Sequence, residues 1–94
     1  MNPPVQHNPD QNRFECSLQG ALALCQYRRR DGGVDFVHTE VPEALSGQGV
    51  AAAMVRQALE WARSEGLSVR PLCSYVASYM RRHPETQDLL ERGA

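Results

Sequence analysis

Two glycines separated by one residue form the segment of this chain that is best suited to chemistry. Gly47 and Gly49 flank Gln48, and an apolar, alanine-rich run of residues 50–59 follows at once. Glycine lets the backbone turn sharply and approach a ligand closely, and the start of a helix presents unpaired N–H groups and the positive end of its dipole. The pattern is consistent with a phosphate-binding turn and equally consistent with a plain capped turn.

Three further residues are of types that carry out acid–base or nucleophilic chemistry. Cys73 ends an expected strand just before an expected helix, where backbone amides favour a thiolate, so it is a candidate nucleophile or proton donor. A small buried cysteine is the alternative. His38 and Glu40 are two residues apart on an expected strand, so both side chains point to one face and together could take a proton from an amine. A solvated or packing pair is the alternative.

The elements that would position these groups follow a mixed α and β pattern. Alternating apolar residues predict three antiparallel strands in succession, at 14–19, 21–29 and 34–41. Apolar residues at helical spacing then predict a helix from residue 50 that Gly66 ends. A fourth strand over 67–73 would return parallel to the third, and a helix over 75–82, capped by Ser74, and a short helical turn at 86–91 would follow.

One proline interrupts the expected fourth strand. Pro71 has no backbone N–H to donate, which indicates a bulge or a splaying of this strand away from its neighbour. A gap at that place would admit a ligand. The glycine turn, the end of the third strand and Cys73 would all lie around it.

Length, charge and cysteine content bound the remaining possibilities. With 94 residues the chain forms one domain, expected over residues 13–94, after a flexible tail at 1–12 that is rich in proline and polar residues. A net charge of −1 provides no general attraction for nucleic acid or an anionic membrane, and the arginine run 28–30 is expected to be a solvated hairpin end. The 3 cysteines show no metal-ligand spacing, and no apolar leader is present, which predicts a reduced, cytoplasmic protein without a metal.

Four motifs in sequence order resemble the small, single-domain branch of the GNAT superfamily of N-acetyltransferases. They are His38–Glu43, Gly47–Ala51, Pro71–Val76 and Arg82–Glu85, and the resemblance spans roughly residues 13–90. It implies an α+β fold with a mixed sheet: a reduced GNAT core of three antiparallel strands, a crossover helix, a fourth strand parallel to the third with a splay, and C-terminal helices.

The resemblance also implies a cosubstrate and the residues that hold it. In the family the glycine loop binds the pyrophosphate of acetyl-CoA through backbone amides, which here belong to Gly47, Gln48, Gly49, Val50, Ala51 and Ala52. Pantetheine would pair with the backbone near Thr39 and Val41 and enter the gap beside the fourth strand. Ser46 stands where the family pattern has Arg or Gln, so one phosphate contact would be lost.

Transfer of an acetyl group from acetyl-CoA to an unidentified amine, of a peptide, a protein or a small molecule, is the activity that the resemblance implies. Cys73 matches the cysteine suspected of a catalytic role in the family, and His38 belongs to its His-Thr motif. A tyrosine near Tyr75 or Tyr79 often acts as an acid in such proteins, although helical spacing favours packing. A non-catalytic module that binds acetyl-CoA or CoA is the alternative, and the chain is expected to be a monomer or weak homodimer.

Overall fold

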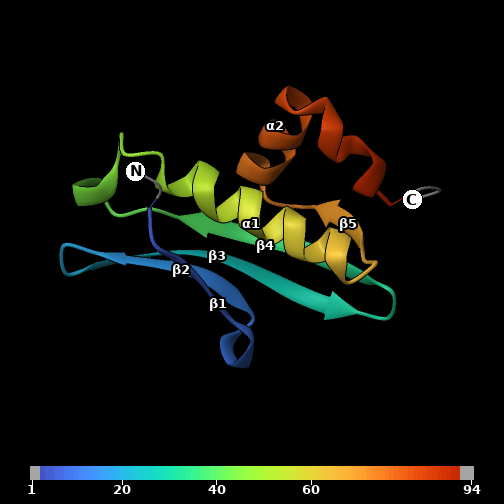
Figure 1. The fold of residues 1–94 in the computed structure, drawn as a ribbon, viewed down its shortest axis with the longest axis horizontal. Coiled ribbons are helices and arrows are strands. Elements are labelled where there is room, and N and C mark those ends of the chain that lie inside the picture. The colour runs from blue at the N-terminus through green and yellow to red at the C-terminus, as the bar shows by residue number, and fades with distance from the viewer. Residues whose placement is uncertain (1–2, 92–94) are drawn as a thin grey trace.

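A mixed five-stranded sheet is the base of the fold in the computed structural model, which describes residues 3–91 (Figure 1). The strands lie in the order β1-β2-β3-β4-β5. The first four pair antiparallel with their neighbours, and β5 pairs parallel with β4. Their bounds are β1 Val5–Asn8, β2 Arg13–Leu18, β3 Ala21–Arg30, β4 Gly33–Glu40 and β5 Ser68–Pro71. The predicted α+β fold with a mixed sheet is therefore confirmed.

Two α-helices and three short 3-10 helices complete the fold. They are α1 Val50–Ser64, α2 Ser74–Arg82, η1 Pro9–Gln11, η2 Glu43–Leu45 and η3 Pro84–Leu89. Figure 1 shows α1 running along the sheet, and this helix contacts all five strands. Its buried side includes the fully buried Met54, while Arg56, Glu60 and Arg63 face away from the core. This amphipathic pattern is the one that the helical spacing predicts.

Gly66 ends α1 as predicted. Its φ is +69°, and the amides of Gly66 and Leu67 donate to the carbonyls of Arg63 and Ala62 at 3.1 and 2.8 Å. These are the two hydrogen bonds of a glycine-terminated helix. They turn the chain directly into β5, so the connection from α1 to β5 is short.

The expectation of a flexible tail over residues 1–12 is wrong for most of that segment. β1 pairs with β2, and η1 continues the chain to the next strand. The ring of His7 stacks on Phe14 at 4.2 Å, and its Nε2 lies 2.6 Å from the Tyr27 hydroxyl. Aromatic stacking and a hydrogen bond therefore anchor a segment whose composition alone indicates disorder. Residues 1–2, and residues 92–94 of the predicted domain, lie outside the described residues.

A β-bulge divides β4 into two parts. Gln26 faces His38 and the next residue of β3, Tyr27, faces Phe36, so Val37 is an extra residue in β4. The bulge reverses the alternation of side chains along the strand. Phe36 before it and Thr39 after it therefore share the face that α1 covers, as the burial of Phe36 and the contacts of Thr39 show.

The pairing between β4 and β5 stops where the bulge begins. Phe36 is the last residue of β4 with a partner in β5, namely Pro71, and the amide of Cys73 then donates to the Phe36 carbonyl at 2.8 Å. β4 continues to Glu40, whereas β5 ends at Pro71 and α2 begins soon after, at Ser74. The predicted splay lies here, while the bulge belongs to β4 and not to the strand that contains Pro71.

The arginine run at the β3–β4 hairpin is more ordered than expected. Arg29 lies over the ring of Trp61 at 5.6 Å, and Arg30 bonds Asp35 and Glu91, each at 2.7 Å. Arg70 of β5 also binds Asp35, at 2.7 Å. Arg30 is thus part of the packed structure, because the carboxylates of Asp35 and Glu91 bind it, whereas Arg28 and Arg29 are exposed as expected.

Candidate functional site

The glycine loop has the backbone conformation that a phosphate-binding turn requires. Gly47 and Gly49 have φ values of +80° and +74°, and Gly49 is the N-cap of α1. No cap from a side chain and no acidic residue occurs in the first turn of the helix. A Cβ added to either glycine would meet nothing within 4 Å, so the glycines are required by the backbone conformation and not by crowding. The helix start is free to receive an anion.

A hollow of about 270 Å³ lies over this loop. It joins the loop to Val41, the residue that follows β4, and to Tyr75 in the first turn of α2. Five predicted loop residues line it, namely Gly47, Gly49, Val50, Ala51 and Ala52. The Gln48 side chain turns back to donate to the Ala44 carbonyl at 3.3 Å, and this residue lines the neighbouring hollow. The structure therefore brings the predicted loop residues and Val41 together.

Cys73 lies beside Thr39 on the helix-covered side of β4. Its Sγ donates to Thr39 Oγ1 at 3.4 Å, and this oxygen donates in turn to Cys25 Sγ at 3.7 Å. Cys73 is the N-cap of α2, whereas the sequence predicted Ser74, which is instead the first residue of the helix. Cys25 and Cys73 are buried, and Thr39 is half-buried. Burial raises the pKa of the Cys25 thiol to about 11, against the opposing hydrogen bond from Thr39.

His38 and Glu40 form the predicted pair, on the opposite face of β4. His38 Nε2 lies 3.2 Å from Glu40 Oε1, and the two side chains are 52% and 62% exposed. Because the bulge reverses the alternation, the strand backbone separates this pair from Cys73. The three predicted catalytic residues thus form two groups around one strand. The His38–Glu40 pair is exposed to solvent, and Cys73 is buried.

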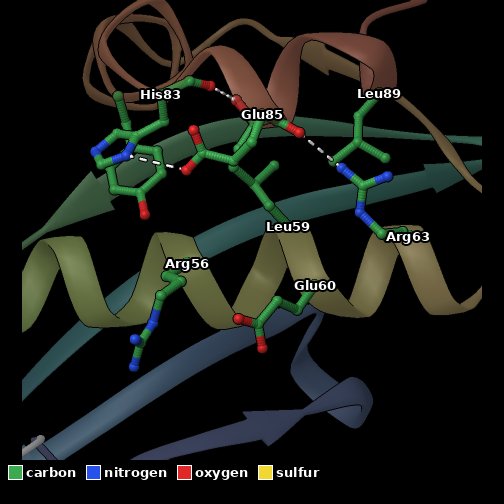
Figure 2. Close-up of a pocket in the computed structure, with 9 residues that line it drawn as sticks. Arg56, Leu59, Glu60, Arg63, His83, Glu85 and Leu89 are labelled. Atoms are coloured by element: carbon green, nitrogen blue, oxygen red, sulfur yellow. Dashed lines mark hydrogen bonds and ion pairs between the residues drawn. The ribbon is translucent and has the colours of Figure 1, made fainter.

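A second hollow, of about 290 Å³, lies between α1, α2 and η3 (Figure 2). Figure 2 shows Arg56 and Glu60 on α1. His83 contacts Glu85 on the other side of the hollow, with 3.4 Å between His83 Nδ1 and Glu85 Oε2. None of the predicted site residues lines it. A third hollow, of about 330 Å³, adjoins the glycine loop through Gly49 and shares Arg56 and His83 with the second. The surface from the loop to His83 is therefore hollowed along α1.

Arg56 was not predicted as a site residue, and Tyr75 was weighed as an acid but expected to pack. Arg56 lines both hollows along α1, and Tyr75 lines the hollow over the loop, whereas Tyr79 stacks on His83 at 3.9 Å. Burial raises the pKa of Tyr79. The position of Arg56, two helical turns after Gly49, is the only sequence signal for it.

Among residues 3–91 no group of three or more His, Cys, Asp or Glu side chains could hold a metal ion.

Comparison with known proteins identifies the family. A model of the GCN5-related N-acetyltransferase family matches residues 13–89, most of the chain. The chain belongs to the GCN5-related N-acetyltransferase family. This is the GNAT superfamily that the sequence motifs resemble, and the match includes the glycine loop, β4 and Cys73.

Relatives and a solved structure of similar size agree with this membership. The chain is 32% identical to Protein NATD1 of Xenopus tropicalis in an alignment 89 residues long that covers 90% of the chain and 81% of that protein. It is 33% identical to Protein NATD1 of Homo sapiens, covering 90% of the chain and 78% of that protein. A solution structure of a GCN5-like protein from Staphylococcus aureus has a TM-score of 0.73 and 28% identity and covers 98% of the chain and 94% of that protein.

This GNAT domain shares its small size with a solved protein. The matched solution structure covers nearly the whole chain, so the reduced core is found in another member of the family as well. Within the described residues, no helix of this GNAT domain has the length and apolar character needed to cross a membrane.

Proposed function

We propose that this chain is an N-acetyltransferase that uses acetyl-CoA as cosubstrate. The observation that carries the proposal is the junction of the glycine loop with the part of β4 that β5 leaves unpaired. The amides of residues 47–52 would bind the pyrophosphate, and the free edge of β4 near Thr39 and Val41 would pair with pantetheine. The thioester would then lie at the splay, next to Cys73.

The two groups around β4 favour direct transfer to the amine. His38, assisted by Glu40, would take a proton from the amine on the exposed face. The amine nitrogen would form a bond to the carbonyl carbon while the bond from that carbon to sulfur breaks, and Cys73 would give its proton to the departing CoA thiolate. His38 does not contact Cys73 across the strand, so a thiol nucleophile activated by this histidine has no support in the geometry.

The hollows along α1 suggest where the adenosine end of the cosubstrate would bind. They begin at Gly49 and contain Arg56 and His83. A guanidinium binds phosphate with paired N–H groups, so Arg56 would hold the 3′-phosphate of CoA. A variant Arg56→Ala is expected to bind CoA more weakly and dephospho-CoA unchanged. Equal losses for both ligands would argue against this contact.

The nature of the amine stays open, because the exposed face that carries His38 and Glu40 would admit a peptide, a protein or a small molecule. We propose a single domain over residues 13–94, extended by the β1 segment, that acts as a monomer or weak homodimer in the cytoplasm. One observation favours the alternative of a non-catalytic acetyl-CoA or CoA-binding module. Ser46 is exposed at the loop position where the resemblance expects Arg or Gln.

Calorimetric titration with acetyl-CoA tests the ligand. The variant Gly49→Ala places a side chain at φ +74° in the loop, and Gly20→Ala does so at φ +77° in the β2–β3 hairpin, with no atom within 4 Å in either case. The two substitutions therefore carry the same backbone strain, and only the first lies at the proposed site. We expect Gly49→Ala to weaken binding at least about fivefold, because the loop amides turn away from the ligand, and Gly20→Ala to bind as the unmodified protein does. Absence of binding at millimolar acetyl-CoA would exclude both ligand-based functions.

Release of the CoA thiol in the presence of a panel of amines tests catalysis, and intact-mass analysis follows the protein itself. Direct transfer predicts amine-dependent release that falls in Cys73→Ala and in His38→Ala, without an acetylated protein. An acetyl adduct that disappears in Cys73→Ala would show a covalent route instead. Binding without release for any amine would favour the binding module.

A further inference from the structure

The Thr39 hydroxyl lies between two buried thiols and contacts both. It accepts a hydrogen bond from Cys73 Sγ at 3.4 Å and donates one to Cys25 Sγ at 3.7 Å. A hydroxyl has one proton, so it can donate to only one sulfur at a time, but rotation about its C–O bond changes which sulfur receives it. Both thiols have an S–H that can donate to the oxygen. The three groups therefore form a chain whose direction can reverse without movement of a heavy atom.

The two ends of this chain differ in their ability to hold a negative charge. Cys25 has no exposed surface, and burial raises its pKa to about 11, so it stays a thiol near neutral pH. Cys73 retains 9% exposure and caps the nine-residue helix α2, whose first amides and dipole favour an anion. The other candidate acid–base groups of this strand, His38 and Glu40, face the opposite side of β4. Negative charge in this cluster therefore belongs on Cys73.

We propose that Thr39 is a positioning residue whose hydroxyl reverses its hydrogen bond to stabilise Cys73 when this cysteine loses its proton. In the protonated state Cys73 donates to Thr39, which donates to Cys25. When the proton leaves Cys73, for a departing thiolate or for water, Thr39 donates to the Cys73 sulfur and the S–H of Cys25 donates to the Thr39 oxygen. One proton leaves, no covalent bond between heavy atoms changes, and no hydrogen-bond donor loses its acceptor.

This inference rests on the proposed function only for the identity of the group that receives the proton. The hydrogen-bond reversal itself is a property of the free protein. Hydrogen bonds to charged groups are stronger than those between neutral groups, so the Thr39 hydroxyl favours the deprotonated form of Cys73. The expected effect can be measured on the thiol without acetyl-CoA, which separates failure of this inference from failure of the proposed function.

The test is the rate of alkylation of Cys73 by iodoacetamide as a function of pH, with the modified site identified by peptide mass analysis. In Thr39→Val, which keeps the side-chain volume and removes the hydroxyl, we expect a rate at neutral pH about tenfold lower and a pH midpoint about one unit higher. Thr39→Ser keeps the hydroxyl and should restore the midpoint. The matched control is Thr86→Val, a buried threonine whose hydroxyl instead donates to the His83 carbonyl at 2.7 Å.

A purely structural role for Thr39 would change the limiting alkylation rate at high pH, because access to the thiol changes, but it would not move the midpoint. If Thr39→Val does not fold, Thr39→Ser and Thr39→Ala provide a second pair that differs only in the hydroxyl, and the same difference in midpoint is expected between them. Equal midpoints within the folded pair would overturn the proposal. A shift of the same size in Thr86→Val would do so as well.

Discussion

Replacing Asp35 by Asn should destabilise the fold strongly, because this buried carboxylate is shared by two arginines. The Asp35 carboxylate accepts hydrogen bonds from Arg30 Nε at 2.7 Å and from Arg70 Nε and Nη2 at 2.8 and 2.7 Å, and its side chain is only 4% exposed. An amide of the same shape removes the charge and leaves two guanidinium groups without their shared partner. We expect a loss of about 3 kcal/mol in the free energy of unfolding, at the lower end for a broken buried pair because both arginines reach water.

Urea unfolding, followed by the fluorescence of Trp61, measures this loss, and a thermal scan should show a melting temperature lower by about 15 °C. The matched control is Glu91→Gln. Glu91 contacts Arg30 at 2.7 Å but is 25% exposed, so about 1 kcal/mol or less should be lost. A loss below about 1 kcal/mol for Asp35→Asn would show that the cluster does not stabilise the fold.

The stability contributed by Asp35 also has a defined pH dependence. Its hydrogen bond from Arg70, with that from Arg30, holds the pKa of the carboxyl well below its usual range, against the effect of burial. A carboxyl with a lowered pKa in the folded state contributes fully above its unfolded pKa of about 4, and the contribution is lost as the pH falls from there. The difference in stability between the protein and Asp35→Asn should therefore shrink below about pH 4. A difference that grows on acidification would contradict this reasoning.

Three further predictions concern the N-terminal strand, the core and the hollows along α1. Burial lowers the pKa of His7 in the folded state, so β1, which His7 anchors, should loosen as the pH falls through about 6.5. Faster amide exchange of β1 would show this loosening, and His7→Phe should abolish the pH dependence. Met54→Ala empties a fully buried position and should remove about 3 kcal/mol in urea unfolding, whereas Gln57→Ala on the same helix should change little. Arg56→Ala should weaken CoA binding about tenfold and leave dephospho-CoA binding unchanged, as titration of both ligands would show.

The glycine loop could be predicted from the sequence because its requirements are local. Positive φ values need glycine, and a helix start without acidic residues can be recognised from neighbouring positions alone. The crossover helix and its end at Gly66 are local for the same reason. The alternation of side chains also predicted correctly that His38 and Glu40 share a face, because no bulge falls between them.

Features that depend on contacts between distant residues could not be predicted. β1 is polar and follows two prolines, and its stability comes from the stacking of His7 on Phe14, which only the folded chain brings together. The Cys73–Thr39–Cys25 chain spans three separate segments. The bulge at Val37 leaves no mark in the composition of β4. A prediction that assumes strict alternation through Val37 therefore places His38 and Thr39 on the wrong faces relative to Phe36.

The extra residue Val37 contributes to the splay between β4 and β5. It lies directly after the last residue of β4 that pairs with β5, and a bulge bends a strand and increases its twist. Loss of three nucleotides would return β4 to regular alternation with His38 and Thr39 on their present faces. Such a chain would keep its core and its loop, while the bend that carries β4 away from β5 would be reduced. A single in-frame deletion thus narrows the opening between the two strands and leaves the rest of the fold in place.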